Sequence, residues 1–177
     1  SDVYKRQIMN CMREFTVAQA RLTPENAAAE IDRVLQHCFL TRRPVYIQLP
    51  SDITHVKIAA INAPLQLDYP QGDPALLEQA IKQLVMSIST AKHPLFLIDN
   101  EAHIFSVSEL LLQLATDYNI PYVSLTTSKH VMDESSALYA GVYLGQGSDP
   151  LIRELVEESD CLIGIGVRFT DAATGFF

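Results

Sequence analysis

Three short, unbroken apolar segments in the second half of the chain constrain its fold more than any other feature. They occupy residues 94–98, 121–125 and 161–165, and each follows a segment with the periodicity of an amphipathic helix. Strands that are apolar at every position are typical of a parallel sheet with both faces covered. Helices that alternate with such strands predict an α/β fold in which right-handed crossovers cover the sheet.

The helices in this half have recognisable starts. Asp73 and Asp149 are each followed by a proline, which suits the first helical position because an N–H there would be unpaired anyway. Ser106 and Glu109 have the spacing of a capping box. These signals predict three helices with an apolar face on each. The faces comprise Leu77, Ile81, Leu84, Val85 and Ile88 in the first helix, Val107, Leu110, Leu111, Leu114, Ala115 and Tyr118 in the second, and Leu151, Ile152, Leu155 and Val156, which should point inward, in the third.

The first part of the chain carries one clear helix and one clear strand. Thr23 is a candidate N-cap with Pro24 at the first helical position, and an apolar stripe follows at helical spacing as far as Cys38. Residues 45–49 are β-branched and aromatic and lie between two prolines, which predicts a strand. Residues 53–73 have no sustained period and several prolines, as in an extended interdomain connection.

These patterns predict two α/β domains, neither of them complete. Residues 1–52 should hold the last helix and strand of one domain, and residues 53–73 a linker. Residues 74–177 should form an incomplete Rossmann-like domain, because three strands are fewer than the roughly five or six of a doubly wound sheet. The sequence closes on Phe176 and Phe177 with nothing after them to cover these side chains. The chain is therefore expected to be a piece of a longer polypeptide.

Composition and charge exclude several classes of protein. Hydrophobic residues make up 48% of the 177 residues, which is enough apolar surface to offset the entropy of folding and excludes intrinsic disorder. The formal charge of −8 argues against nucleic-acid binding and against docking onto anionic membranes, since both need clustered Lys and Arg. No apolar run approaches the roughly 18–20 residues that span a bilayer. No disulfide framework can be formed from Cys11, Cys38 and Cys161, and Cys38 and Cys161 should be buried hydrophobes. A cytoplasmic location is therefore expected.

Few residues carry a pattern that points to chemistry. Gly164 and Gly166 follow a strand, but Phe169 stands where a dinucleotide fingerprint needs its third glycine, and the strand is not the first of its sheet. Asp133 and Glu134 are typical of a solvated turn. The histidines lack metal-ligand spacing, so solvated or structural roles are expected for all five. They are His37, His55, His93, His103 and His130. The residues alone predict part of an α/β enzyme or binding protein.

Six strings of the sequence go further than these patterns. They are residues 15–20, 27–35, 43–52, 141–145, 154–160 and 166–176. The first three resemble the end of the pyrimidine-binding domain of thiamine-diphosphate-dependent 2-oxo acid decarboxylases, and the last three resemble the central domain of the same family. The Arg-Phe-Thr-Asp string at 168–171 leans toward the indolepyruvate decarboxylases. Residues 1–7 match nothing in the family, and His130 stands where relatives commonly carry glycine.

The resemblance implies a full-length enzyme that uses thiamine diphosphate and Mg²⁺ to decarboxylate 2-oxo acids such as indolepyruvate or pyruvate. The cofactor ylid adds to the 2-oxo carbon and stores the electrons that departing CO₂ leaves behind. In this family a glutamate and paired histidines come from the early pyrimidine-binding domain, and a Gly-Asp-Gly motif comes from the carboxyl-terminal domain. Neither region is in this chain, so we expect no catalytic, cofactor-binding or metal-binding residue here. The chain alone should bind neither cofactor and should be inactive.

The resemblance also implies self-association, because each cofactor lies between domains of two subunits. The parent enzyme is expected to be a homodimer or homotetramer, with a small-molecule substrate and no nucleic-acid or membrane partner. Two alternatives stay open. One is a carboligase of the acetolactate-synthase kind, whose central domain holds FAD, although the turn at 126–129 is bulkier than such a domain needs. The other is a non-enzymatic nucleotide-binding regulator built on the same sheet.

Overall fold

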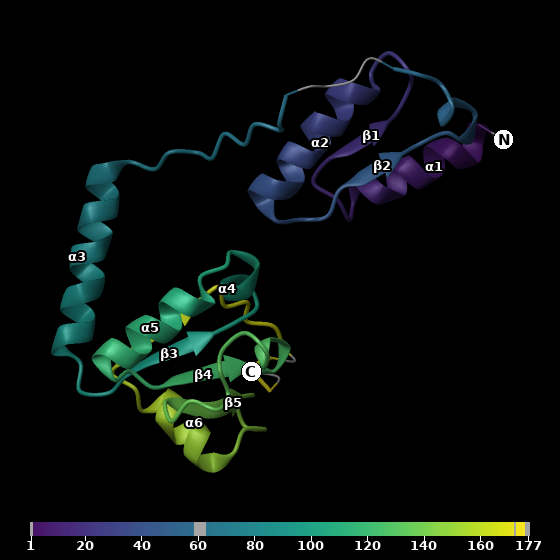
Figure 1. Cartoon of the computed structure of the whole chain (residues 1–177). Helices are drawn as coiled ribbons and strands as arrows, with labels where there is room; N and C mark the ends of the chain where they lie inside the picture. Colours follow the sequence, from purple (N-terminus) through teal and green to yellow (C-terminus); the bar gives the residue numbers. More distant parts are fainter. Residues whose placement is uncertain (1, 59–62, 172, 176–177) are drawn as a thin grey trace. The chain divides into compact units, whose positions relative to one another are not determined.

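The computed structural model describes residues 2–58, 63–171 and 173–175 and divides the chain into two compact units (Figure 1). The N-terminal unit is Ser1–Gln71 and the C-terminal unit is Gly72–Phe177. Residues 54–58 and 63–73 form no helix or strand. Phe176 and Phe177, whose exposure the sequence predicts, lie outside the described residues, as do positions 59–62 of the expected linker.

The N-terminal unit contains two short parallel strands and two helices that contact them. Its elements are α1 (Asp2–Arg13), β1 (Gln19–Arg21), α2 (Ala27–Thr41), β2 (Tyr46–Gln48) and the 3₁₀ turn η1 (Ser51–Ile53). Ala20 of β1 lies opposite Ile47 of β2. Val34 of α2 is fully buried in a small core with Ala18, Ala20, Leu22 and Ala27. The predicted helix and strand are confirmed, whereas the sequence did not reveal α1 or β1.

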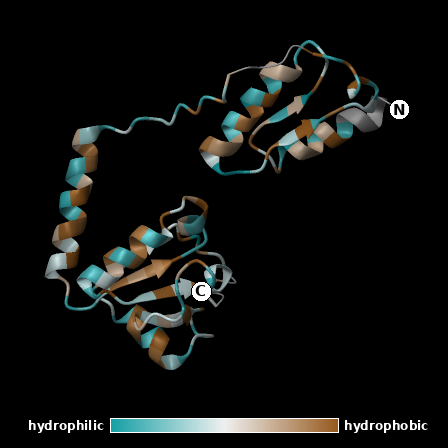
Figure 2. Cartoon of the chain, viewed as in Figure 1, coloured by the Kyte–Doolittle hydropathy of each residue, from teal (hydrophilic) through white to brown (hydrophobic). Residues whose placement is uncertain are grey.

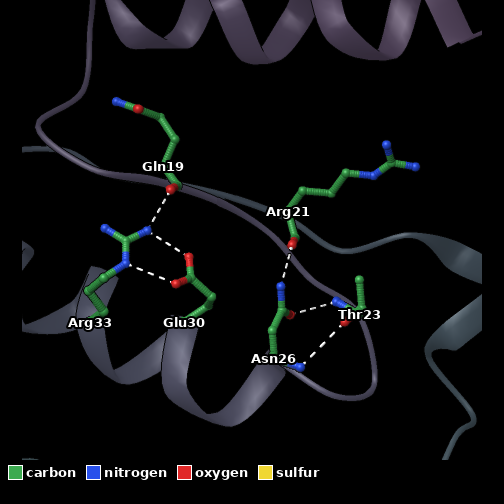
Figure 3. A network of polar contacts seen from close by, with 6 residues as sticks. All are labelled: Gln19, Arg21, Thr23, Asn26, Glu30 and Arg33. Atoms are coloured by element: carbon green, nitrogen blue, oxygen red, sulfur yellow. Dashed lines mark hydrogen bonds and ion pairs between the residues drawn. The ribbon is translucent and has the colours of Figure 1, made fainter.

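The predicted start of α2 at Thr23 and Pro24 is wrong. The helix begins at Ala27, with Asn26 at the N-cap. The backbone N–H of Thr23 donates to the Asn26 side-chain oxygen (2.7 Å), and the backbone N–H of Asn26 donates to the Thr23 hydroxyl (3.3 Å). The Asn26 amide also donates to the carbonyl of Arg21 (3.2 Å; Figure 3). These bonds close a turn over residues 23–26, so the proline lies in that turn and not in the first turn of the helix.

A second polar group ties α2 to β1. Arg33 donates twice to the Glu30 carboxylate, at 2.6 and 3.1 Å, and once to the carbonyl of Gln19 (2.8 Å; Figure 3). Hydrogen bonds from Arg33 lower the pKa of Glu30 below its ordinary value. The guanidinium thus bridges one turn of the helix to the edge of the neighbouring strand.

The C-terminal unit is built on one four-stranded parallel sheet. Its elements are α3 (Pro74–Thr90), β3 (Pro94–Ile98), α4 (Glu101–Ile104), α5 (Ser108–Tyr118), β4 (Tyr122–Leu125), the 3₁₀ turn η2 (Thr126–Ser128), β5 (Tyr139–Tyr143), α6 (Pro150–Glu157) and β6 (Cys161–Ile165). The strand order is β5-β4-β3-β6, and every pairing is parallel. The predicted α/β class and the three predicted strands are confirmed. The fourth strand, β5, is an addition, since Gly141 and the half-buried residues around it break the continuous apolar pattern.

The core lies on both faces of this sheet, as the apolar strands predicted. Alternate residues of β3 enter opposite clusters, Phe96 and Ile98 on one face and Leu95 and Leu97 on the other. Ala115 of α5 packs in the first cluster and Val156 of α6 in the second. All four β3 residues are at most 1% exposed. Burying each such side chain contributes about 1.5–3 kcal/mol, so this strand anchors the unit.

Two of the three predicted helix starts are confirmed. The Asp73 carboxylate accepts the backbone N–H of Ala75 (2.8 Å), and the Asp149 carboxylate accepts that of Leu151 (2.9 Å). The capping box at Ser106 is wrong, because α5 begins at Ser108 with Val107 as its N-cap. The N–H of residue 107 donates back to the carbonyl of Ala102 and closes α4, which leaves Ser106 at a φ of +57° without a capping hydrogen bond.

The apolar face of α3 is formed as predicted but is largely uncovered in this unit, although Ile88 packs against the core. None of its described residues is buried, and Leu77, Ile81, Leu84 and Val85 are between 44% and 61% exposed. Hydrophobic residues along α3 are visible in Figure 2. A cavity of about 270 Å³ lies between α3 and α5, lined by Leu84, Val85, Ile88, Ser89, Leu114, Tyr118 and Ile120. Leu151 of α6 is 76% exposed, so its predicted inward position is wrong, whereas Val156 is buried as predicted.

Candidate functional site at the carboxyl ends of the strands

Beside β3 the chain reverses the direction in which it winds from strand to strand across the sheet. From β3 the chain winds to β4 and β5 on one side and then returns to place β6 on the other side. Ligands of open parallel sheets bind beyond the carboxyl ends of the strands at such a reversal. A cavity of about 300 Å³ lies at this position. It is lined by Asp99, Asn100, Glu101, Ile104, Thr127, Gly166, Arg168 and Thr170, and we call it the switch-point cavity.

Asp99 is the buried polar residue at the base of this cavity. It directly follows β3 and is only 5% exposed. One carboxylate oxygen accepts the hydroxyl of Thr127 (2.8 Å) and the backbone N–H of Asn100 (2.7 Å). The other oxygen accepts the backbone N–H of Arg168 (3.0 Å). A buried carboxylate needs such partners, because an unpaired buried charge is very costly. Asp99 therefore fastens together the segments that follow β3, β4 and β6.

Gly166 allows the segment after β6 to lie close to the segment after β3. Its φ is +61°, and a Cβ added there would lie 2.6 Å from the Cβ of Glu101. Just beyond it, the Arg168 guanidinium pairs with the Glu101 carboxylate at 3.1 Å. These two side chains are 66% and 38% exposed, so solvent screens the pair and its contribution to stability is small.

The lining of the cavity suits hydrogen bonding better than covalent chemistry. It offers two carboxylates, an amide, hydroxyls and a guanidinium, and its eight residues include no histidine, cysteine or lysine. No group of three or more His, Cys, Asp or Glu that could hold a metal ion occurs among residues 2–58, 63–171 and 173–175. The described residues thus present no such group for the Mg²⁺ that accompanies thiamine diphosphate. The expectation that this chain holds no catalytic residue stays a prediction.

The cavity also differs from a dinucleotide site. The first strand of the unit, β3, runs into Asp99, Asn100 and Glu101 without a glycine, and Gly166 follows the last strand, not the first. The Asp99 carboxylate accepts backbone N–H groups of the kind that cradle a phosphate, and its charge opposes a diphosphate. Neither FAD nor NAD fits these residues.

Most of the other residues that the sequence singled out are dispersed. His37, His55 and His93 are exposed, whereas the rings of His103 and His130 lie in edge contact, with centroids 5.5 Å apart. No pattern in the sequence indicates this contact, since the two residues are distant along the chain.

Two further predictions concern the acidic pair and the cysteines. The Asp133 carboxylate accepts the backbone N–H and the hydroxyl of Ser135, which lowers the pKa of Asp133 and confirms an exposed turn. Cys38 and Cys161 are half-buried and not buried as predicted, Cys11 is exposed, and all three are free thiols.

Sequence reasoning missed Asp99 and Glu101, and it noted Arg168 only as part of a string and not as part of a cavity. Asp99 and Glu101 match no short motif, and their neighbours in the fold are distant in the sequence. One feature of the sequence could have predicted a role for Asp99. This residue directly follows a buried strand, and parallel sheets bind ligands beyond the carboxyl ends of their strands.

No helix among the described residues is long and apolar enough to cross a membrane.

Comparison with known proteins decides the family. The sequence model for the central domain of thiamine pyrophosphate enzymes matches residues 81–176, more than half of the chain. The chain belongs to the thiamine pyrophosphate enzyme family. The match covers every strand of the four-stranded sheet, so the Rossmann-like α/β fold agrees with the family assignment.

Curated relatives of this chain are decarboxylases. A pyruvate decarboxylase of Aspergillus terreus is 35% identical over 163 residues, which cover 90% of this chain and 29% of that protein. An alpha-keto-acid decarboxylase of Mycobacterium bovis is 39% identical over 168 residues, 93% of this chain and 29% of that protein. A pyruvate decarboxylase of Candida albicans is 31% identical over 154 residues, 86% and 27% respectively. The chain thus spans less than a third of the length of these relatives.

Proposed function

We propose that the chain is part of a non-oxidative decarboxylase that converts 2-oxo acids to an aldehyde and CO₂ with thiamine diphosphate and Mg²⁺. The observation that carries this proposal is the similarity to relatives named as decarboxylases of pyruvate and alpha-keto acids over 90–93% of the chain, which includes both units. Indolepyruvate and pyruvate are the proposed substrates. The indolepyruvate proposal rests on the string at 168–171, which lines the switch-point cavity in part.

Within that enzyme we assign residues 1–52 to the end of the pyrimidine-binding domain, residues 53–73 to a linker and residues 74–177 to part of the central domain. Uncovered apolar surfaces support this division. The edge strand β6 leaves Leu162 43% exposed, and the apolar face of α3 is largely uncovered. Further elements of a longer central domain would cover such surfaces. The proposed role of the segment is to hold the two cofactor-binding domains in place, without contributing a reacting group.

Asp99 argues against the two alternatives. An acetolactate-synthase-like carboligase needs a central domain that binds FAD, and a nucleotide-binding regulator needs a phosphate cradle at the same point. In this chain a buried carboxylate takes the backbone donors of the segments after β3 and β6. A site of that charge and lining favours the decarboxylase.

The full-length enzyme tests the proposal. After removal of cofactors with EDTA, it should release CO₂ from indolepyruvate or pyruvate only when thiamine diphosphate and Mg²⁺ are both restored, and it should show no flavin absorbance. Stoichiometric flavin with acetolactate as the product would overturn it. Sedimentation should show at least a dimer, and an active monomer would contradict the shared cofactor site.

A further inference from the structure

His103 and His130 are brought together by two elements that are rigidly held. Ala102, which precedes His103 in α4, is 1% exposed, and Val131, which follows His130, is 5% exposed. Both belong to the same hydrophobic cluster. The backbone positions of the two histidines are therefore fixed relative to each other, while both side chains are exposed.

The turn that carries His130 is anchored to the end of β3. The hydroxyl of Ser128 donates to the carbonyl of Ile98 (2.9 Å), and the hydroxyl of Thr127 donates to the Asp99 carboxylate (2.8 Å). The N–H of Val131 closes the turn on the carbonyl of residue 128 (3.0 Å). The pair thus stands beside the switch-point cavity, whose lining includes Thr127 and Ile104.

The separation of the two rings fits a shared metal ion. A zinc–imidazole bond is about 2.0–2.1 Å long, so a bound ion lies about 3.2 Å from the centre of each ring. At a tetrahedral ligand angle, two such rings have centroids about 5.2 Å apart. The observed separation is 5.5 Å, with 72° between the ring planes. Both side chains are exposed, so changes in their χ angles can close the difference of about 0.3 Å and turn a nitrogen of each ring toward a shared ion.

We propose that His103 and His130 form a two-histidine site for a late first-row divalent cation such as Ni²⁺, Cu²⁺ or Zn²⁺. Imidazole nitrogen is a preferred ligand of these ions. No group of three or more candidate ligands occurs in the described part of the chain, so water completes the coordination and the ion stays exchangeable. Binding would clamp α4 to the turn after η2 at the rim of the cavity.

Titration of the 177-residue chain with NiCl₂ tests this site. The protein is made without a histidine tag and with Cys11→Ser, because the exposed thiol of Cys11 would bind the ion as well. Calorimetry at pH 7.5 should show one saturable Ni²⁺ per chain. His103→Gln and His130→Gln should each weaken binding at least about tenfold, since even outer-shell partners of a metal are worth about 10–100-fold in affinity. His37→Gln, at an exposed position of the other unit, is the matched control and should leave binding unchanged.

A second measurement keeps the test independent of affinity. In the chain labelled with ¹⁵N-histidine, paramagnetic Ni²⁺ should broaden the imidazole signals of His103 and His130 before those of His37, His55 and His93. Absence of saturable binding would overturn the proposal. So would loss of binding in only one of the two variants, or broadening of a different pair.

Discussion

Replacing Asp99 with alanine tests how far one buried carboxylate holds the C-terminal unit together. The change removes the acceptor for the Thr127 hydroxyl and for the backbone N–H groups of Asn100 and Arg168. Hydrogen bonds to a charged group are worth about 1.5–3 kcal/mol each, so the three set an upper limit of several kcal/mol. Two effects reduce this loss. Water can enter the cavity of about 300 Å³ that all three donors border, and the alanine variant no longer buries a charge at residue 99. We therefore expect a net loss of about 2–4 kcal/mol.

The assay has to report the C-terminal unit alone, because the two units can unfold separately. Hydrogen-exchange mass spectrometry across a urea series, read on peptides from β3, β4 and β6, does so. Asp99→Asn should cost about 1–3 kcal/mol, since its amide keeps one acceptor but presents a donor to one of the three donors. Asp68→Ala, at an exposed linker position, is the control and should stay within about 0.5 kcal/mol of the parent. If Asp99→Ala lost no more stability than this control, Asp99 would not hold together the segments that follow β3, β4 and β6.

Three further predictions concern the cofactor, the backbone and pH. Titration of the 177-residue chain with thiamine diphosphate and Mg²⁺ should show neither saturable binding nor CO₂ release from indolepyruvate; micromolar binding would show that the active site is misplaced. Gly166→Ala should destabilise the C-terminal unit by about 1–3 kcal/mol, because residue 166 has a φ of +61° and the new Cβ would meet Glu101. Gly72→Ala is the control, since residue 72 has open space around it, and it should be nearly neutral in the same urea series. Arg33 lowers the pKa of Glu30 in the folded state, so the Glu30–Arg33 pair contributes its full stability above the unfolded pKa of Glu30 and loses it as pH falls through the folded pKa. Acid unfolding of the N-terminal unit, followed by hydrogen exchange, should therefore depend less on pH in Arg33→Gln. A pH profile equal to that of the parent would contradict this coupling.

The sequence predicted those elements whose neighbours in the fold are local or whose burial is complete. Pro94–Ile98 and Cys161–Ile165 match their predicted bounds, because both strands are apolar almost throughout and are bounded by polar residues or turns. Asp73 and Asp149 cap as predicted, since each capping carboxylate and the backbone N–H that donates to it are two residues apart. Ser106 does not, because the closing bond from residue 107 to α4 takes precedence over a local capping pattern.

The switch-point cavity was beyond local reasoning. Thr127 and Arg168 lie 28 and 69 residues from Asp99, and no periodicity records such a contact. The edge contact of His103 with His130 was hidden for the same reason. The sequence does show that Asp99 follows a buried strand. The strand order is also needed, because it alone shows that the chain changes its winding direction at this strand.

The strand order also sets when the site can exist during folding. The first strand of the unit, β3, keeps one edge open until β6, the last, pairs with it, with Leu95 opposite Leu162. That pairing closes a long loop, and non-local contacts of this kind form slowly because the entropy of loop closure is lost before they are made. The hydrogen bond from Arg168 to Asp99 depends on the same step. During folding the cavity is thus absent until β6 pairs with β3, and until then one edge of β3 stays without its partner strand.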